Sequence, residues 1–271
     1  MPELPEVETT RRGLSPFLSQ QRIVAVNIRE PRLRWPVPTE IARVLPGLVI
    51  EHVGRRAKYL LLTTSDGTLI IHLGMSGSLR IVELGTPPTK HDHVELVLQN
   101  GRCVRLRDPR RFGSVSWTAG DPLIHPLLVN LGPEPTSRQF YGEYLYHQSR
   151  RRRIAVKSFI MNNQVVVGVG NIYANEALYE AKIHPARRAN HISKTRYDRL
   201  TEAIRKVIDA AITAGGTSVR DFVNSQGQPG YFSQSLRAYG RSGQSCQRCG
   251  QTLRQTRIGQ RSSVYCPYCQ R

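Results

Sequence analysis

The sequence predicts an α+β chain of two domains, in which an N-terminal β-sandwich with a flanking helix precedes a helical domain and a four-cysteine module. Three observations predict this class. Short β-rich runs alternate with turn residues from about residue 23 to 117, a segment near residue 200 has helical periodicity, and four cysteines form two close pairs near the end. The 271 residues, 39% of them hydrophobic, suffice for two ordinary domains.

The first expected element is a helix from Pro5 to Leu18. Proline fits the first position of a helix, and Glu6 and Glu8 fall in the first turn, where the helix dipole favours acidic residues. One face of this helix is formed by Val7, Arg11, Leu14 and Leu18. We therefore expect it to flank the sandwich.

Seven short runs rich in β-forming residues follow. The clearest hairpin turns between them are Asp66-Gly67 and Asn100-Gly101, which are dipeptides typical of tight turns. Strands this short, separated by turn residues, are typical of a β-sandwich. The runs are Ile23–Ile28, Leu48–Val53, Tyr59–Thr63, Thr68–Leu73, His93–Leu98, Cys103–Leu106 and Ser114–Trp117.

A stretch rich in proline and glycine, from about residue 121 to 143, separates the strands from the helical part. There, residues Arg196 to Ala214 have helical spacing of apolar side chains, and Gly215-Gly216 ends the helix. The expected divisions are a first domain at 2–130, a linker at 131–143, a helical domain at 144–235 and a final module at 236–271.

A glycine-rich turn, Val165–Gly170, precedes another expected helix that begins near Asn171. Backbone amides left open by glycine at a helix N-terminus can hold a phosphate group. A routine loop before a core helix accounts for the same residues, and the pattern alone leaves both interpretations open.

The four terminal cysteines have the spacing C-x2-C-x16-C-x2-C, which is a strong zinc pattern. Two knuckles each supply two thiolates to one tetrahedral ion. Four protein ligands leave no open coordination position, so we expect one structural Zn²⁺. Between the knuckles, Gln251–Gln255 and Ser262–Tyr265 are expected to pair around a turn at Gly259. The ligands are Cys246, Cys249, Cys266 and Cys269.

The chain is strongly basic, with a formal net charge of +19 and a pI near 10.4. A globular protein of this charge usually binds a polyanion, most often nucleic acid. The charge is also unevenly placed: residues 222–271 contain no Asp or Glu, and Arg150–Arg153 is a run of four arginines. No stretch is apolar enough to span a membrane and no secretory signal is visible, so we expect a cytosolic protein.

The N-terminus carries a candidate nucleophile. Removal of Met1 before the small Pro2 would leave a secondary amine, and an α-amino group has a pKa of about 8, so part of it is unprotonated at neutral pH. Such an amine attacks electrophilic carbon and forms an imine. Glu3 lies directly beside it and could act as acid or base. Most proteins that begin with Met-Pro-Glu have no catalytic N-terminus, so other segments of the chain must show whether Pro2 has this role.

Several segments in order along the chain resemble the bacterial formamidopyrimidine-DNA glycosylase family, which repairs oxidised purines. The resemblance covers essentially the whole chain, and a set of matches in the right order is far more specific than any one of them. The segments are Pro2–Glu8, Arg55–Tyr59, His72–Gly77, Asp108–Gly113, Gly168–Tyr173 and the four-cysteine finger.

The resemblance implies a helix-two-turn-helix motif in the C-terminal helical part and a bifunctional reaction. Pro2 would attack C1′ of the damaged nucleotide, expel the base through a Schiff base, and cleave the strand by successive β- and δ-elimination. Glu3 would handle protons at the sugar, and Lys58 would take part in proton transfer. Arg261 in the finger would contact the phosphate at the lesion.

The resemblance also assigns DNA contacts. Three side chains would fill the space left by an extruded nucleotide, because a glycosylase must unstack its target base. Three others would contact phosphates, and the segment 217–231 would close over the flipped base. The void-filling residues are Met75, Arg110 and Phe112, and the phosphate contacts are His91, Arg152 and Asn171.

The expected partner is double-stranded DNA containing oxidised purines or abasic sites, and the expected location is the bacterial cytosol and nucleoid, with the protein acting as a monomer. Two alternatives stay open. An endonuclease VIII-like enzyme for oxidised pyrimidines shares the architecture, although Leu4 favours the purine branch. A non-catalytic zinc-ribbon DNA-binding protein explains the charge and the finger, but not Pro2, Glu3 or Lys58.

Overall fold

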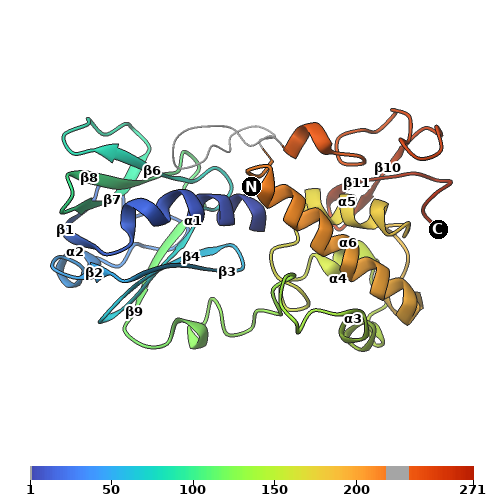
Figure 1. Cartoon of the computed structure of the whole chain (residues 1–271), viewed down its shortest axis with the longest axis horizontal. Helices are drawn as coiled ribbons and strands as arrows, with labels where there is room; N and C mark the ends of the chain where they lie inside the picture. The colour runs from blue at the N-terminus through green and yellow to red at the C-terminus, as the bar shows by residue number, and fades with distance from the viewer. Residues whose placement is uncertain (1, 218–231) are drawn as a thin grey trace. The chain divides into compact units, whose positions relative to one another are not determined.

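A computed structural model describes residues 2–217 and 232–271 (Figure 1). The chain forms two compact units, and each unit consists of two separate segments of the chain. The first unit contains Met1–Val129 and Ala214–Tyr231, and the second contains Asn130–Thr213 and Phe232–Arg271. The expected linker at 131–143 and the expected finger at 236–271 both lie within the second unit, and the finer domain bounds stay a prediction. Segment 218–231 lies outside the described residues.

The first unit is the expected β-sandwich, built from two antiparallel sheets and the helix α1 (Leu4–Leu18), with a short helix α2 (Ile41–Val44) and a 3-10 turn η1 (Pro122–Ile124). The five-stranded sheet has the order β2 (Val49–Ile50), β1 (Gln21–Ile28), β7 (Asp92–Leu98), β8 (Arg102–Arg107) and β6 (Ser78–Glu83). The four-stranded sheet has the order β3 (His52–Arg56), β4 (Tyr59–Thr64), β5 (Gly67–His72) and β9 (Ser114–Thr118).

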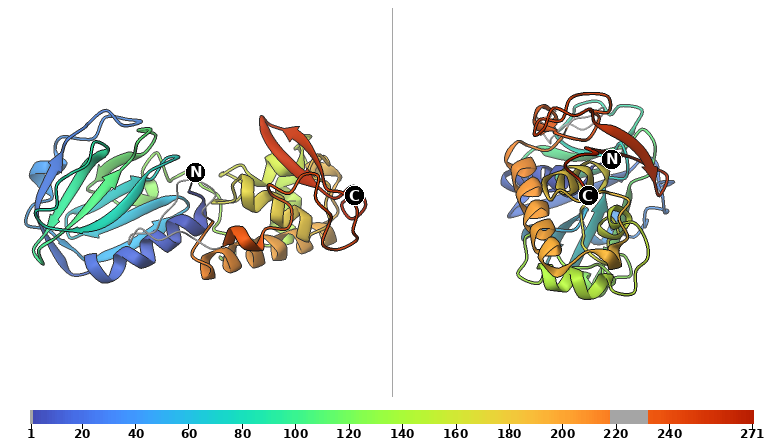
Figure 2. Two further views of the ribbon diagram at one scale, coloured as in Figure 1. Left: turned by 90° about the horizontal axis from the view of Figure 1, so that it is seen from above. Right: turned by 90° about the vertical axis from the view of Figure 1, so that its right-hand side faces the viewer.

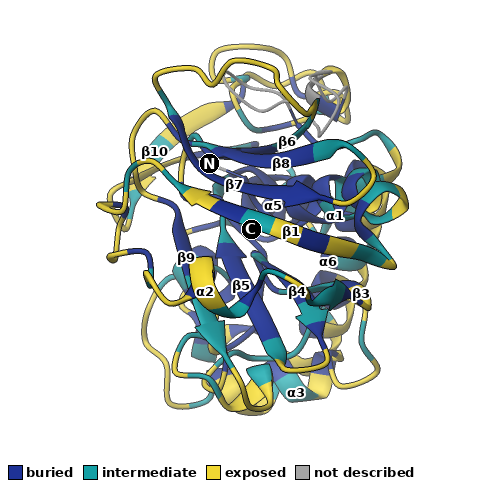
Figure 3. Cartoon of the chain, turned by 90° about the vertical axis from the view of Figure 1, so that its left-hand side faces the viewer, coloured by how far each residue is buried: buried dark blue, intermediate teal, exposed yellow. Residues whose placement is uncertain are grey.

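The core of this unit lies between the sheets, where side chains from both contribute to one apolar cluster. Figure 3 shows long buried stretches along the strands of both sheets. Helix α1 contacts β3 and β6, which are edge strands of the two sheets, so it covers one open side of the sandwich. Its apolar face is fully buried at Leu14 and Leu18. The helix begins at Leu4, one residue before the expected start, because Glu3 and Glu6 form a capping box that fixes its first turn.

Two details of the sandwich differ from expectation. The run Leu48–Val53 is not one strand: β2 pairs with β1 in one sheet, and β3 pairs with β4 in the other, so the chain changes sheets at Glu51. Strand β6 was not predicted. Apolar and polar residues alternate only weakly along this strand, because several of its side chains are only half-buried.

The second unit contains the helices α3 (Gly142–Ser149), α4 (Val156–Ile160), α5 (Asn171–Glu180) and α6 (Lys194–Thr213), with the 3-10 turns η2 (Ala189–His191) and η3 (Phe232–Ser235) (Figure 2). The predicted helices near Asn171 and over 196–214 are confirmed. Helices α3 and α4 were not predicted, because they are short and α3 begins within the stretch expected to be a linker.

The finger hairpin, β10 (Arg254–Ile258) and β11 (Arg261–Tyr265), packs on the helices rather than standing apart. Lys157 of α4 is 1% exposed, and its ammonium donates hydrogen bonds of 2.7 Å to the Ser262 carbonyl and the Ser263 hydroxyl. Asn175 of α5 accepts a 2.7 Å bond from the Val264 amide. These buried bonds explain why helices and finger form a single unit.

Across the described part of the chain, no helix combines the length and the apolar character needed to cross a membrane.

Candidate active site and metal centre

The N-terminal residues lie inside the protein rather than at its surface. Pro2 is buried, and Glu3 and Glu6 are 3% and 2% exposed. The Glu3 amide donates a 2.7 Å hydrogen bond to Oε2 of Glu6, which completes the capping box. The first turn of α1 therefore fixes the backbone of the candidate nucleophile and its neighbouring carboxylate in one conformation.

The second oxygen of Glu6 binds a distant part of the chain. Oε1 accepts a 2.7 Å hydrogen bond from the Thr217 amide. Gly216 approaches the same side chain with a φ of +83°, and a Cβ there would lie 3.2 Å from Cγ and Oε1 of Glu6. One buried carboxylate thus joins the start of α1 to the last described residues before segment 218–231, a link that the sequence did not reveal.

Lys58 lies at the turn between β3 and β4, next to Ala57, whose φ is +54°. Its side chain is 8% exposed, so it is not the surface lysine that the bare sequence allowed. The neighbouring strands pair Tyr59 with His72. Burial, and then the positive charges of Lys58 and Arg34, lower the pKa of His72 to about 4. His72 is therefore neutral at pH 7, and its Nδ1 accepts a 2.9 Å bond from the Gly74 amide.

The three candidate void-filling side chains lie on two loops that touch. Met75 is 40% exposed, Phe112 is 42% exposed, and the Arg110 guanidinium lies 4.8 Å from the centre of the Phe112 ring. The loops meet at Gly74, where a Cβ would come within 2.4 Å of the Gly113 nitrogen and the Phe112 carbonyl carbon. Only glycine permits this approach, and the exposed Met75 and Phe112 are not core residues.

Asp108 holds the same two loops together. It is fully buried, and its carboxylate accepts bonds from the Ser76 hydroxyl at 2.8 Å, the Gly113 amide at 2.7 Å and the Arg110 amide at 3.3 Å. A carboxylate that accepts several donors is a strong organising group in a buried site. In the sequence, Asp108 is visible only as an aspartate that closely follows a β-rich run. That position does not reveal that its carboxylate holds two loops together.

The remaining candidate contacts are distributed over both units. His91 is half-buried, and its carbonyl accepts a bond from the Asp108 amide. Asn171 is the first residue of α5 and follows the N-cap Gly170, while Arg152 is exposed in the loop before α4. Arg261 is exposed at the hairpin turn, directly after Gly259 and Gln260, which both have positive φ.

The four finger cysteines converge as the spacing predicts. Their sulfur atoms all lie within 4.8 Å of one another, and Cys249 and Cys266 are 3.5 Å apart. A tetrahedral zinc ion with bonds of about 2.3 Å holds its sulfurs about 3.8 Å apart, so the donor set and spacing fit Zn²⁺. The Tyr179 hydroxyl contacts the Cys246 sulfur at 3.1 Å, which ties the centre to α5.

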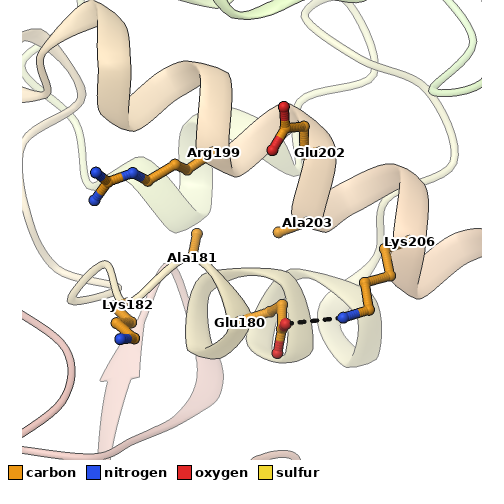
Figure 4. Close-up of a pocket in the computed structure, with 7 residues that line it drawn as sticks. All are labelled: Glu180, Ala181, Lys182, Arg199, Glu202, Ala203 and Lys206. Carbon is orange, nitrogen blue, oxygen red and sulfur yellow. Dashed lines mark hydrogen bonds and ion pairs between the residues drawn. The ribbon is translucent and has the colours of Figure 1, made fainter.

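A surface cavity of about 530 Å³ lies between α5 and α6 (Figure 4). Its lining combines both charges, and Lys206 pairs with Glu180 at 3.2 Å across it. Neither a single charge sign nor a cluster of candidate residues marks it as part of the site.

Comparison with known proteins supplies the family. Three family models match the chain in order: the formamidopyrimidine-DNA glycosylase N-terminal domain at residues 1–115, the H2TH domain of the same enzymes at 131–223, and the zinc finger found in FPG and IleRS at 243–271. The chain belongs to the formamidopyrimidine-DNA glycosylase family. The fold class, the helix-two-turn-helix domain and the structural zinc site expected from the sequence are thereby confirmed.

Relatives of the same name are similar over their full length. The formamidopyrimidine-DNA glycosylases of Syntrophotalea carbinolica and Methylococcus capsulatus are 59% and 58% identical, with all of both chains covered. Among solved structures, a Lactococcus lactis FPG mutant with DNA containing Fapy-dG has a TM-score of 0.91 at 33% identity, and MutM with carbocyclic 8-oxo-G DNA has 0.90 at 34%; each covers all of both chains.

Proposed function

We propose that this chain is a bifunctional enzyme of base excision repair, which removes 8-oxoguanine and formamidopyrimidines from double-stranded DNA and then cleaves the strand. The observation that carries the proposal is the buried N-terminus, where Pro2 and Glu3 are fixed by the capping box of α1 in a member of a DNA glycosylase family. Solved structures of relatives in complex with DNA that contains Fapy-dG, 8-oxo-G or an abasic site support the substrate class.

After removal of Met1, the lone pair of the Pro2 nitrogen attacks C1′ and the bond from C1′ to the base breaks. The base leaves with the electrons of the broken bond and takes up a proton. The Pro2 nitrogen then gives up its N–H proton, and protonation of O4′ opens the sugar ring to a cationic iminium. The iminium makes the C2′ hydrogen acidic. Loss of this proton expels the 3′ phosphate by β-elimination, and a second elimination expels the 5′ phosphate.

The chain's own groups have separate tasks in this scheme. Glu3 exchanges protons with the sugar, and Lys58 assists base loss and elimination. Arg261 binds the phosphate at the lesion and serves the second elimination. The structural zinc ion fixes the hairpin that carries Arg261 and takes no part in the chemistry.

The nucleotide must leave the duplex before it can react, and other side chains must replace it. We assign this role to Met75, Arg110 and Phe112, since they project from two loops joined by a buried carboxylate. We assign phosphate contacts to His91, Arg152 and Asn171. Closure of 217–231 over the flipped base is also proposed, although only Thr217 of that segment is described.

Borohydride trapping on a duplex with 8-oxoguanine opposite cytosine tests the proposal. We expect a covalent adduct that maps to Pro2, and no adduct or strand cleavage with Pro2→Gly despite retained binding. Pro38→Gly, in a loop of the same unit, is the matched control. Normal DNA binding by the processed wild-type chain without any adduct would contradict the mechanism and favour the non-catalytic zinc-ribbon protein.

A second candidate is activity on oxidised pyrimidines, because Lactococcus lactis Fpg, with a TM-score of 0.90, forms a complex with DNA that contains an oxidised pyrimidine. A panel of duplexes, each with a single lesion, separates the two by rate of excision. We place the enzyme in the cytosol at the nucleoid, where its DNA substrate lies and where thiolates stay reduced for zinc.

A further inference from the structure

A cluster of arginines lies on the outer face of the five-stranded sheet, away from the apolar core. Strands β6 and β8 pair Ser78 with Arg107, and Arg80 lies two residues further along β6. Residues directly opposite on paired strands share a face, as do residues two apart. The three side chains therefore lie on one face, and they line a cavity of about 460 Å³ together with Ser76, Pro109 and Arg110.

The arginines of this cavity lack the partners that arginines elsewhere on the sheet have. Arg105, opposite Arg80, is ion-paired with Glu95 and binds the carbonyls of Thr86 and Pro87. Among the described residues, no carboxylate lies within ion-pair distance of Arg80, Arg107 or Arg110. The Nε of Arg80 is moreover buried without a hydrogen-bond partner in residues 2–217 and 232–271.

The carboxylate next to Arg107 in the sequence does not neutralise this cluster. Asp108 follows Arg107 directly, but its oxygens accept bonds from the Ser76 hydroxyl and two backbone amides. Three guanidinium groups around one cavity repel one another, and a buried donor without a partner costs free energy. Both costs are relieved when an anion with several acceptor oxygens enters the cavity.

We propose that Arg80 and Arg107, with Ser78, form a binding site for one phosphodiester of the DNA backbone, next to the void-filling Arg110. Arg110 belongs both to this cavity and to the exposed loop of Phe112, so a bound strand would pass from that loop to the site. The proposal extends the proposed function, since it adds a phosphate contact that orients DNA without reading sequence.

The test is the salt dependence of DNA binding by the full zinc-loaded chain. For a short lesion-free duplex, we expect Arg107→Gln to lower the slope of log K against log [KCl] by about 1 and to weaken binding equally on lesion-containing DNA. Arg43→Gln, which removes an exposed arginine of α2, should keep the wild-type slope. An unchanged slope with Arg107→Gln would overturn the proposal.

Two further measurements locate the contact. In a series of duplexes with one neutral methylphosphonate each, one position should weaken wild-type binding but leave Arg107→Gln unaffected; a series in which every position affects both alike contradicts the proposal. The second measurement uses the wild-type protein, so it does not depend on whether a variant folds. In its NMR spectrum, the Arg80 Nε–H resonance should shift on addition of duplex. A shift with inorganic phosphate but not with DNA would assign the site to a free anion and overturn the DNA assignment.

These three measurements report DNA binding and do not depend on base excision or strand cleavage. A wild-type protein that gives no borohydride adduct but shows the expected slope change would refute the proposed function and leave the phosphate site standing. The opposite pair of results would refute the site alone.

Discussion

Replacement of Asp108 by asparagine tests whether one buried carboxylate positions the side chains that we propose fill the space left by the extruded nucleotide. In the wild type, the two carboxylate oxygens accept one hydroxyl and two amide donors from the loops of Met75 and Phe112. The asparagine side chain would keep one acceptor oxygen but would point its amide group at a donor. A lost bond to a charged group is worth about 1.5–3 kcal/mol, and an unsatisfied buried donor costs about 1–3 kcal/mol.

We therefore expect Asp108→Asn to lower the free energy of unfolding of the first unit by about 2.5–6 kcal/mol, the sum of these two effects. The assay is urea unfolding, with single-turnover excision measured beside it. Displacement of loop residues by about 1 Å can slow a positioned reaction up to a hundredfold, so excision of paired 8-oxoguanine should fall by about tenfold to a hundredfold. Cleavage at a preformed abasic site should fall less, because less unstacking is needed there.

Asp66→Asn is the matched control, because Asp66 is exposed in a hairpin turn of the same unit. Stability and excision of Asp108→Asn equal to those of this control would refute the role of Asp108. An equal loss on paired and abasic substrates would show a general structural defect instead of a failure to hold the void-filling loops.

Three other perturbations have defined outcomes. Gly216→Ala, which forces a side chain into a left-handed backbone beside Glu6, should cost about 1–3 kcal/mol and reduce borohydride trapping, whereas Gly85→Ala, also at positive φ but in open space, should leave trapping intact. Lys157→Met removes two buried bonds to the finger hairpin, so gels should show more product halted after β-elimination; an unchanged product ratio would exclude coupling of Lys157 to Arg261. His72 has a pKa lowered from 6.5 to about 4, so its neutral form stabilises the fold above pH 6.5, and up to about 3 kcal/mol is lost as the pH falls from 6.5 to 4. Urea unfolding should show this loss in the wild type but not in His72→Gln.

The parts that were predictable from the sequence are those with short-range patterns. The cysteine spacing, the tight turns and the helical period of α6 each depend on neighbouring residues. The resemblance supplied the site residues, but it did not supply what supports them. Asp108 looks like any aspartate after a strand, and its importance arises only when β6 and β8 bring two loops together.

Two other support residues were hidden for the same reason. Lys157 resembles a solvent-exposed helical lysine, yet its partners are more than 100 residues away in the finger. Glu6 resembles an ordinary first-turn acid, yet it binds Thr217, 211 residues later. Such long-range hydrogen bonds have no period or spacing in the sequence, so only the folded arrangement reveals them.

The bond between Glu6 and Thr217 has a consequence for the newly made protein. A ribosome synthesises α1 first, and the amide that completes the Glu6 carboxylate emerges only after the whole of Asn130–Thr213 has been made. Until then, the proposed nucleophile Pro2 lacks part of its surroundings, even though the rest of the sandwich can pair its strands. The nascent chain therefore carries the proposed nucleophile in an incomplete setting, and the bond from Thr217 to Glu6 can form only after about four-fifths of the chain, residue 217 of 271, has been synthesised.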